Sequence, residues 1–196
     1  MDIPFNADYD LAEAFFSSWG FVFQVADNGQ MIITKDACRH EMDNLDEEKA
    51  AKLKGGPKKT NGLISVIDLT DIVFTEAIRE MRHIEKSGIF DELPENKTYY
   101  YPEMSIAAVD NGHVTSMALL EHTMTNELTL VMLKSILASP GKELFLVLRT
   151  VFSKYFQSCP EEMTVRLPLK KEESRKLASR LFPDVDTVIV RRGYFS

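Results

Sequence analysis

The chain has 196 residues, of which 44% are hydrophobic and 27% charged, a composition that indicates a folded globular protein and argues against a disordered one. The net charge of −7 argues against a nucleic-acid partner, because binding to phosphates depends on clustered Lys and Arg. No apolar run reaches the ~20 residues that cross a bilayer, and the first residues lack the features of a secretory signal. We therefore expect no membrane partner and a cytoplasmic location.

The two ends of the chain resemble each other. Residues 1–35 and 163–195 each predict a strand, an amphipathic helix and a second strand, with Pro4 and Pro168 at equivalent places near the end of the short first strand. This similarity indicates either an internal repeat or two unrelated strand–helix–strand units. If it is a repeat, the chain opens with the closing unit of a truncated domain.

A polar segment follows the first unit. The Asp27-Asn28-Gly29 sequence predicts that residues 21–35 form either a hairpin or one bent strand pair. Residues 36–62 contain charged residues and the Gly55-Gly56-Pro57 sequence, which disfavours regular structure. We interpret 36–62 as a connector.

Beyond the connector, strands and helices follow one another closely. The segment Ile64–Leu69 predicts a short strand, and Thr70 or Asp68 caps the helix that follows, which Gly88 ends. Asn111-Gly112 lies between two apolar runs and predicts a hairpin. Further strands and helices are expected at Glu127–Leu133, from Ser139 (as cap, with Pro140 in the first turn) to Tyr155, and at Val165–Leu169, Glu172–Phe182 and Thr187–Val190. The fold class is therefore mixed α/β, with a central mixed sheet that contains an antiparallel hairpin and is flanked by helices.

This order over residues 63–195 resembles the GNAT (N-acetyltransferase) superfamily, in which a strand and helix precede an antiparallel meander, a long strand, the helix that holds the acetyl-CoA pyrophosphate, and a closing strand–helix–strand unit. The closing helix of that family commonly reads Ala-x-x-Phe-Tyr-x-x-x-Gly-Phe, and Ala12–Phe21 is similar to it, with Phe15, Gly20 and Phe21 matching. The resemblance implies a closing unit at 1–35, a connector at 36–62 and a GNAT-like domain at 63–196.

The resemblance also implies acetyl-CoA or another acyl-CoA as co-substrate. The residues it places near that ligand are Leu133, Ser139, Gly141 and Lys142. The family's pyrophosphate loop reads Arg/Gln-x-x-Gly-x-Gly/Ala, because glycines let the amides at a helix N-terminus approach the phosphates. In Ala138–Glu143 only Gly141 matches, so this stretch is either a weakened CoA site or simply the start of a helix.

Three residues near the ends of the expected strands are candidates for the base that receives the amine proton: Glu121, His122 and Glu127. Each of them can equally be a solvated residue at a strand end. The family's general acid is commonly the Tyr of the closing helix, and Phe16 or Ala178 stands at that place here. Neither side chain has a proton to donate.

We expect no metal site, because Cys38 and Cys159 lack Cys-x-x-Cys spacing and the histidines have no partners at ligand spacing. Two functions remain open. The first is a GNAT-like N-acyltransferase whose acceptor is a small-molecule or peptide amine. The second is a catalytically inactive GNAT-like binding or scaffolding module, for which pairing into a homodimer is one possibility.

Overall fold

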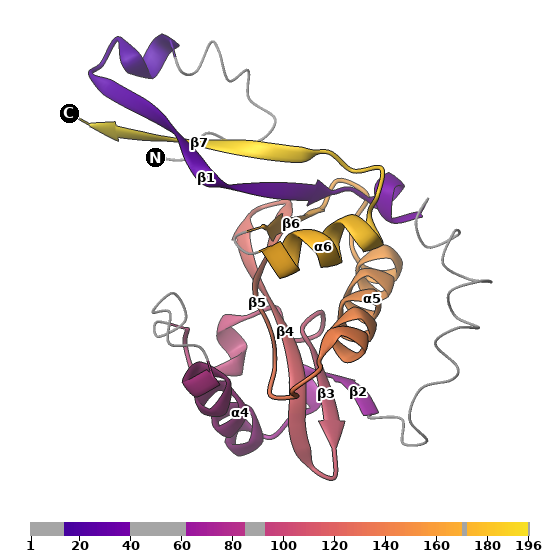
Figure 1. Ribbon diagram of the computed structural model, residues 1–196. Helices are drawn as coiled ribbons and strands as arrows, with labels where there is room; N and C mark the ends of the chain where they lie inside the picture. Colours follow the sequence, from indigo (N-terminus) through magenta and orange to yellow (C-terminus); the bar gives the residue numbers. More distant parts are fainter. Residues whose placement is uncertain (1–13, 40–61, 85–92, 170–171, 196) are drawn as a thin grey trace. The chain divides into compact units, whose positions relative to one another are not determined.

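The structure, a computed structural model, describes residues 14–39, 62–84, 93–169 and 172–195 (Figure 1). Its strands form a seven-stranded mixed sheet in the hydrogen-bonded order β2-β3-β4-β5-β6-β1-β7, flanked by helices. This confirms the predicted mixed α/β fold class. The chain divides into two compact units, Ile33–Arg166 and Met1–Ile32 with Leu167–Ser196.

The predicted division at residues 35 and 62 stays a prediction. Residues 1–13 of the predicted closing unit and residues 40–61 of the predicted connector lie outside the described residues, as does Gly88. At the borders of these ranges, residues 14–17 and 35–39 are helical.

An antiparallel meander forms most of the sheet in the larger unit. The pairs are β2 with β3, β3 with β4 and β4 with β5. Asn111 and Gly112 have φ angles of 52° and 84°, which places both in the left-handed region that this tight turn needs and confirms the predicted hairpin. The strands are β2 (Gly62–Ser65), β3 (Ile106–Asp110), β4 (His113–Met124) and β5 (Glu127–Ser135).

The first helix of this unit is α4 (Asp71–Ile84). The Thr70 hydroxyl accepts a hydrogen bond from the amide of Val73 at 3.3 Å, so Thr70 and not Asp68 is the cap. The strand expected before it is shorter than predicted, because β2 ends at Ser65 and a 3₁₀ turn, η1 (Val66–Asp68), follows.

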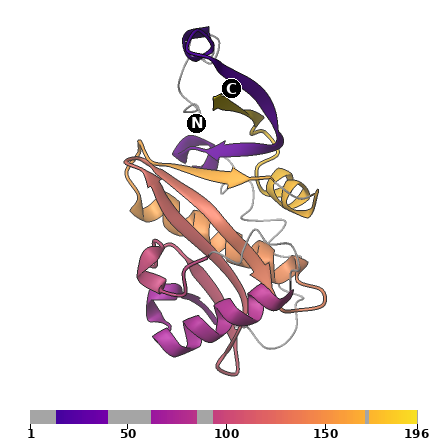
Figure 2. The same ribbon diagram turned by 90° about the vertical axis from the view of Figure 1, so that its left-hand side faces the viewer.

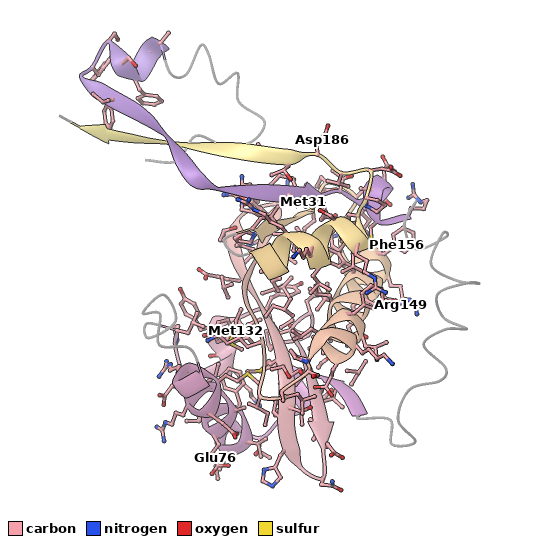
Figure 3. All side chains as sticks on the ribbon, in the orientation of Figure 1. Met31, Glu76, Met132, Arg149, Phe156 and Asp186 are labelled. Carbon is pink, nitrogen blue, oxygen red and sulfur yellow. The ribbon has the colours of Figure 1, made fainter. Side chains whose placement is uncertain are left out.

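Helices α4 and α5 (Gly141–Ser158) lie on opposite faces of the meander (Figures 1 and 2). Met132 points from β5 toward α4 (Figure 3) and belongs to a cluster of buried side chains that includes Phe74, Ile78, Met117 and Leu119. Val131 also packs against this cluster, whereas α5 covers the other face of the meander. The α5 side chains buried there are Phe145, Val147, Leu148, Val151, Phe152 and Tyr155.

The C-terminal end of α5 is fixed by residues that follow β1 (Phe21–Ile33). The buried Lys35 donates a hydrogen bond from Nζ to the Phe156 carbonyl at 2.6 Å. The same ammonium lies 5.9 Å from the ring centroid of Tyr155 and 5.6 Å from that of Phe156, which Figure 3 labels at this end of the helix. A cation at a helix C-terminus is favourable, because the last carbonyls carry partial negative charge.

The smaller unit contains an antiparallel pair of long strands. β1 pairs with β7 (Thr187–Phe195), and α6 (Glu172–Leu181) lies in the chain between β6 (Thr164–Pro168) and β7. The hairpin interpretation of Asp27-Asn28-Gly29 is wrong, because β1 runs on through these residues with a register shift between Val25 and Gly29. The partner strand β7 continues on both sides of the shift, so the local turn signal is overridden.

Candidate functional site

Strand β5 has two different edges. It pairs antiparallel with β4 along its length, but its parallel pairing with β6 joins only Glu127–Thr129 to Thr164–Arg166. Among the described residues, the pairs with β6 end there, while β5 continues to Ser135. From Leu130 onward, this edge of β5 is therefore not part of the ladder with β6.

A β-bulge lies where this change occurs. Leu119 is opposite Met132 and Leu120 is opposite Leu130, so Val131 is an extra residue on β5. Farther along, the Ile136 amide donates to the Thr115 carbonyl at 2.9 Å. Because the hydrogen-bonding groups of a strand alternate in direction, the amide of Leu133 points away from β4, toward the edge of β5 that no longer pairs with β6. We call this edge of β5, from Leu130 to Ser135, the freed edge. The backbone of the predicted ligand residue Leu133 thus lies on the freed edge.

The other three predicted ligand residues lie at the start of α5. Ser139, Gly141 and Lys142 are exposed there. The prediction that Ser139 caps the helix is wrong: Pro140 is the N-cap residue, and it makes no side-chain capping hydrogen bond. A Cβ added at Gly141 would meet no atom within 4 Å, so this position is open.

Glu143, in the first turn of α5, contacts β4. Its carboxylate accepts hydrogen bonds from the Thr115 hydroxyl at 2.8 Å and from the Ser116 hydroxyl. Consecutive residues of a strand normally point to opposite faces, but here β4 has one extra residue opposite β3, since Ala108 pairs with Ser116 and Val109 with Val114. This second bulge allows both hydroxyls to reach one carboxylate. Sequence reasoning missed this contact, because nothing local in the sequence marks the bulge.

Two of the three candidate bases share one face of the sheet. Glu121 is directly opposite Thr129 in β5, and Thr129 is opposite Arg166 in β6. The half-buried Glu121 carboxylate accepts a hydrogen bond from the hydroxyl of the exposed Tyr99 at 3.2 Å. The negative charge of Glu121 and this hydrogen bond raise the pKa of Tyr99. Glu121 is therefore an accessible carboxylate that is hydrogen-bonded to the Tyr99 hydroxyl.

Glu127 lies on the same face but is held differently. It is buried, and its carboxylate forms an ion pair with Arg166 at 2.8 Å and accepts from the Thr123 hydroxyl at 2.9 Å. Thr123 also lies 3.0 Å from the hydroxyl of Thr129, which ties the two strands together on this face. These contacts connect Glu127 to neighbouring strands and leave Glu121 as the more accessible of the two carboxylates.

His122 does not join them. As the residue next to Glu121 it points to the opposite face of the sheet, where its exposed ring lies 6.0 Å from the ring centroid of Tyr101. The structure therefore brings Glu121 and Glu127 to one face and places His122 on the other.

The two cysteine thiols lie in the interior and are not placed to act as nucleophiles. Both Cys38 and Cys159 are free and buried, and burial raises the pKa of Cys38 to about 11 and also raises that of Cys159. Within the part of the chain that the structure describes, no group of three or more His, Cys, Asp and Glu side chains could hold a metal ion. Over the same ranges, the helices are too short or too polar to span a membrane.

Comparison with known proteins gives similarity of fold. No family model and no curated protein matches the chain. Among solved structures, the C-terminal DUF2156 domain of a proposed lysylphosphatidylglycerol synthetase from Agrobacterium fabrum is similar with a TM-score of 0.56 and 12% identity over 92% of this chain and 64% of that one. A conserved protein of unknown function from Staphylococcus epidermidis is similar with a TM-score of 0.50 and 10% identity over 97% of this chain and 68% of that one.

A GCN5-related N-acetyltransferase from Sphaerobacter thermophilus has a TM-score of 0.49 and 17% identity, over 98% of this chain and 58% of that one. This chain therefore spans about two thirds or less of each of these structures. At these identities, the first two comparisons show a shared fold.

Proposed function

We propose that this protein is a GNAT-like N-acyltransferase that transfers an acetyl or other acyl group from acyl-CoA to a small-molecule or peptide amine. The observation that carries the proposal is the freed edge of β5. Its pairing with β6 stops at Thr129, and the extra residue Val131 follows almost at once. An extended thioester that lies along this edge can bind backbone groups of β5, and β-bulges often occur next to active sites.

The order of elements supports the same proposal. The meander β2–β5, the helix α5 and the parallel strand β6 follow the order described for the GNAT superfamily. In the reaction, the amine nitrogen attacks the thioester carbonyl carbon, the carbon–sulfur bond breaks, and the sulfur leaves as a thiolate. The nitrogen's proton passes to a base, while backbone amides that bind the carbonyl oxygen stabilise the charge that develops there.

Glu121 is the base that we favour. Its carboxylate is half-buried and accepts a hydrogen bond from the Tyr99 hydroxyl, whereas the Glu127 carboxylate is engaged by Arg166 and Thr123. A base must be able to reach the amine, and accessibility therefore favours Glu121. His122 stays a third candidate on the other face.

A second function is favoured by a specific observation. The Glu143 carboxylate stands in the first turn of α5, where a phosphate-binding helix would present amides to its ligand. This feature suits a GNAT-like module that binds a partner, or a second copy of itself, without catalysis. Sedimentation at increasing protein concentration tests the homodimer.

Calorimetric titration with acetyl-CoA, followed by an acetyl-transfer assay with a panel of alkyl amines and peptides, separates the two functions. The acyltransferase requires binding and transfer, with Glu121→Gln lowering the rate by about 10²-fold or more while leaving acetyl-CoA binding unchanged. Absence of binding at millimolar acetyl-CoA refutes it and leaves the binding module. Binding without any transfer also refutes the acyltransferase, whereas transfer that Glu121→Gln does not slow refutes the role of Glu121.

A further inference from the structure

Glu143 places a fixed negative charge at the start of α5. Two hydroxyls of β4, those of Thr115 and Ser116, hydrogen-bond to one oxygen of its carboxylate. Ser116 is fully buried and Thr115 is 8% exposed, so both anchors belong to the interior of the protein. If the carboxylate swung away, the buried Ser116 hydroxyl would lose this acceptor, whereas the Thr115 hydroxyl would keep the Ala108 carbonyl at 3.3 Å.

The Glu143 carboxylate already interacts with the positive end of the α5 dipole, with which a bound phosphate would otherwise interact. The N-terminus of a helix carries a partial positive charge, and an acidic side chain in the first turn already interacts with it favourably. A pyrophosphate at the same place adds further negative charge within a few ångströms of a carboxylate. The two repel each other, because exposed charges at that separation are only partly screened.

The rest of this turn does little to offset the repulsion. Pro140 has no amide to donate, and Ala138 is an exposed residue without charge. Lys142 is the basic residue of the stretch 138–143, and its position is exposed, where solvent and salt weaken its attraction for an anion. By contrast, the edge of β5 beyond its pairing with β6 offers backbone groups, which suit the amide and thioester groups of an uncharged pantetheine arm.

We propose that Glu143 makes the binding of the acyl donor independent of the pyrophosphate, so that this protein accepts acyl-pantetheine thioesters as readily as acyl-CoA. The inference rests on the proposed function and names its donor class. The donor is recognised by its pantetheine arm along β5, and the nucleotide end contributes nothing net at α5.

The test is a set of NMR titrations of the whole chain with acetyl-CoA and with acetyl-pantetheine. For the wild-type protein, the two dissociation constants should agree within about threefold. Glu143→Gln keeps the size of the side chain and its ability to accept hydrogen bonds from the two hydroxyls while removing the charge. It should tighten acetyl-CoA by about fivefold and leave acetyl-pantetheine unchanged.

Two controls separate charge from structure. Glu76→Gln removes the same charge from an exposed position on α4 (Figure 3) and should change neither constant. Thr115→Val removes one anchor but keeps the carboxylate, and it should not reproduce the gain of Glu143→Gln.

The inference is overturned if wild-type protein prefers acetyl-CoA by more than about threefold, or if Glu143→Gln fails to tighten acetyl-CoA selectively. Both results leave the proposed function standing. If neither ligand binds to either protein, the proposed function itself is refuted, and the donor class with it.

Discussion

Breaking the ion pair between Arg166 and Glu127 should strongly destabilise the larger unit. The pair joins β5 to β6 at 2.8 Å, and only 18% of the arginine side chain and 11% of the glutamate side chain are exposed. Arg166→Met removes the positive charge and leaves the buried Glu127 carboxylate with its hydrogen bond from the Thr123 hydroxyl. Removing one partner of a buried pair costs about 3–5 kcal/mol, and the residual exposure reduces our expectation to about 2–3 kcal/mol.

A double-mutant cycle isolates the pair from other effects. Glu127→Gln should cost about 2 kcal/mol, and the double variant should cost less than the sum by a coupling energy of about 1–2 kcal/mol. The assay is urea unfolding followed by circular dichroism. Arg79→Ala serves as a control, because it breaks a pair with Glu95 in which 62% of the arginine side chain is exposed, and it should lower the midpoint less. A coupling energy below about 0.5 kcal/mol would refute the reasoning.

Three further outcomes are expected. Lys35→Met should lower the free energy of unfolding by about 2 kcal/mol in the same assay, because it removes the charge that binds the Phe156 carbonyl, and no loss would contradict that role. Gly29→Ala should lower the free energy of unfolding by about 1–3 kcal/mol, because its Cβ would lie 2.5 Å from Thr187 Cγ2. Adding Thr187→Ser, which removes that carbon, should restore most of the loss. A double variant as unstable as Gly29→Ala would refute the clash. Burial raises the pKa of Cys38 from 9.0 to about 11, so its contribution to stability is complete below pH 9 and is lost as the pH rises to 11. Urea midpoints measured across that window should fall less for Cys38→Ala than for wild type, and equal falls would contradict the role of the thiol.

The elements that local sequence specifies were predicted well. The turn at Asn111-Gly112 depends on residues that tolerate positive φ, and the capping of α4 depends on a hydroxyl at Thr70. Both signals act within a few residues of where they occur. Pattern alone therefore sufficed for the meander and for the helices on its two faces.

The predictions failed where residues far away in the sequence determine the local structure. Asp27-Asn28-Gly29 has the local chemistry of a turn, yet β7 supplies a strand partner on both sides of it. Similarly, the contact of Glu143 with Thr115 depends on an extra residue in β4 that only the pairing with β3 reveals. A bulge is a property of two strands together, so one strand's sequence does not show it.

The difference between Glu121 and Glu127 likewise depends on a residue far away in the sequence. Glu121 and Glu127 are both predicted as bases from their places at strand ends. Only the approach of Arg166, 39 residues farther along the chain, distinguishes a held carboxylate from an accessible one. A contact between residues so far apart in the sequence cannot be predicted from the periodicity of apolar residues.

The short contact between β5 and β6 also has a kinetic consequence. The pairs β3–β4 and β4–β5 join neighbours along the chain, whereas the three residue pairs between β5 and β6 form only after α5 and its connections close a long loop. Contacts that close long loops are entropically expensive and form slowly. We therefore expect the meander to gain protection from hydrogen exchange first during refolding, and β6 to join it late, which leaves the outer edge of β5 exposed for the longest time.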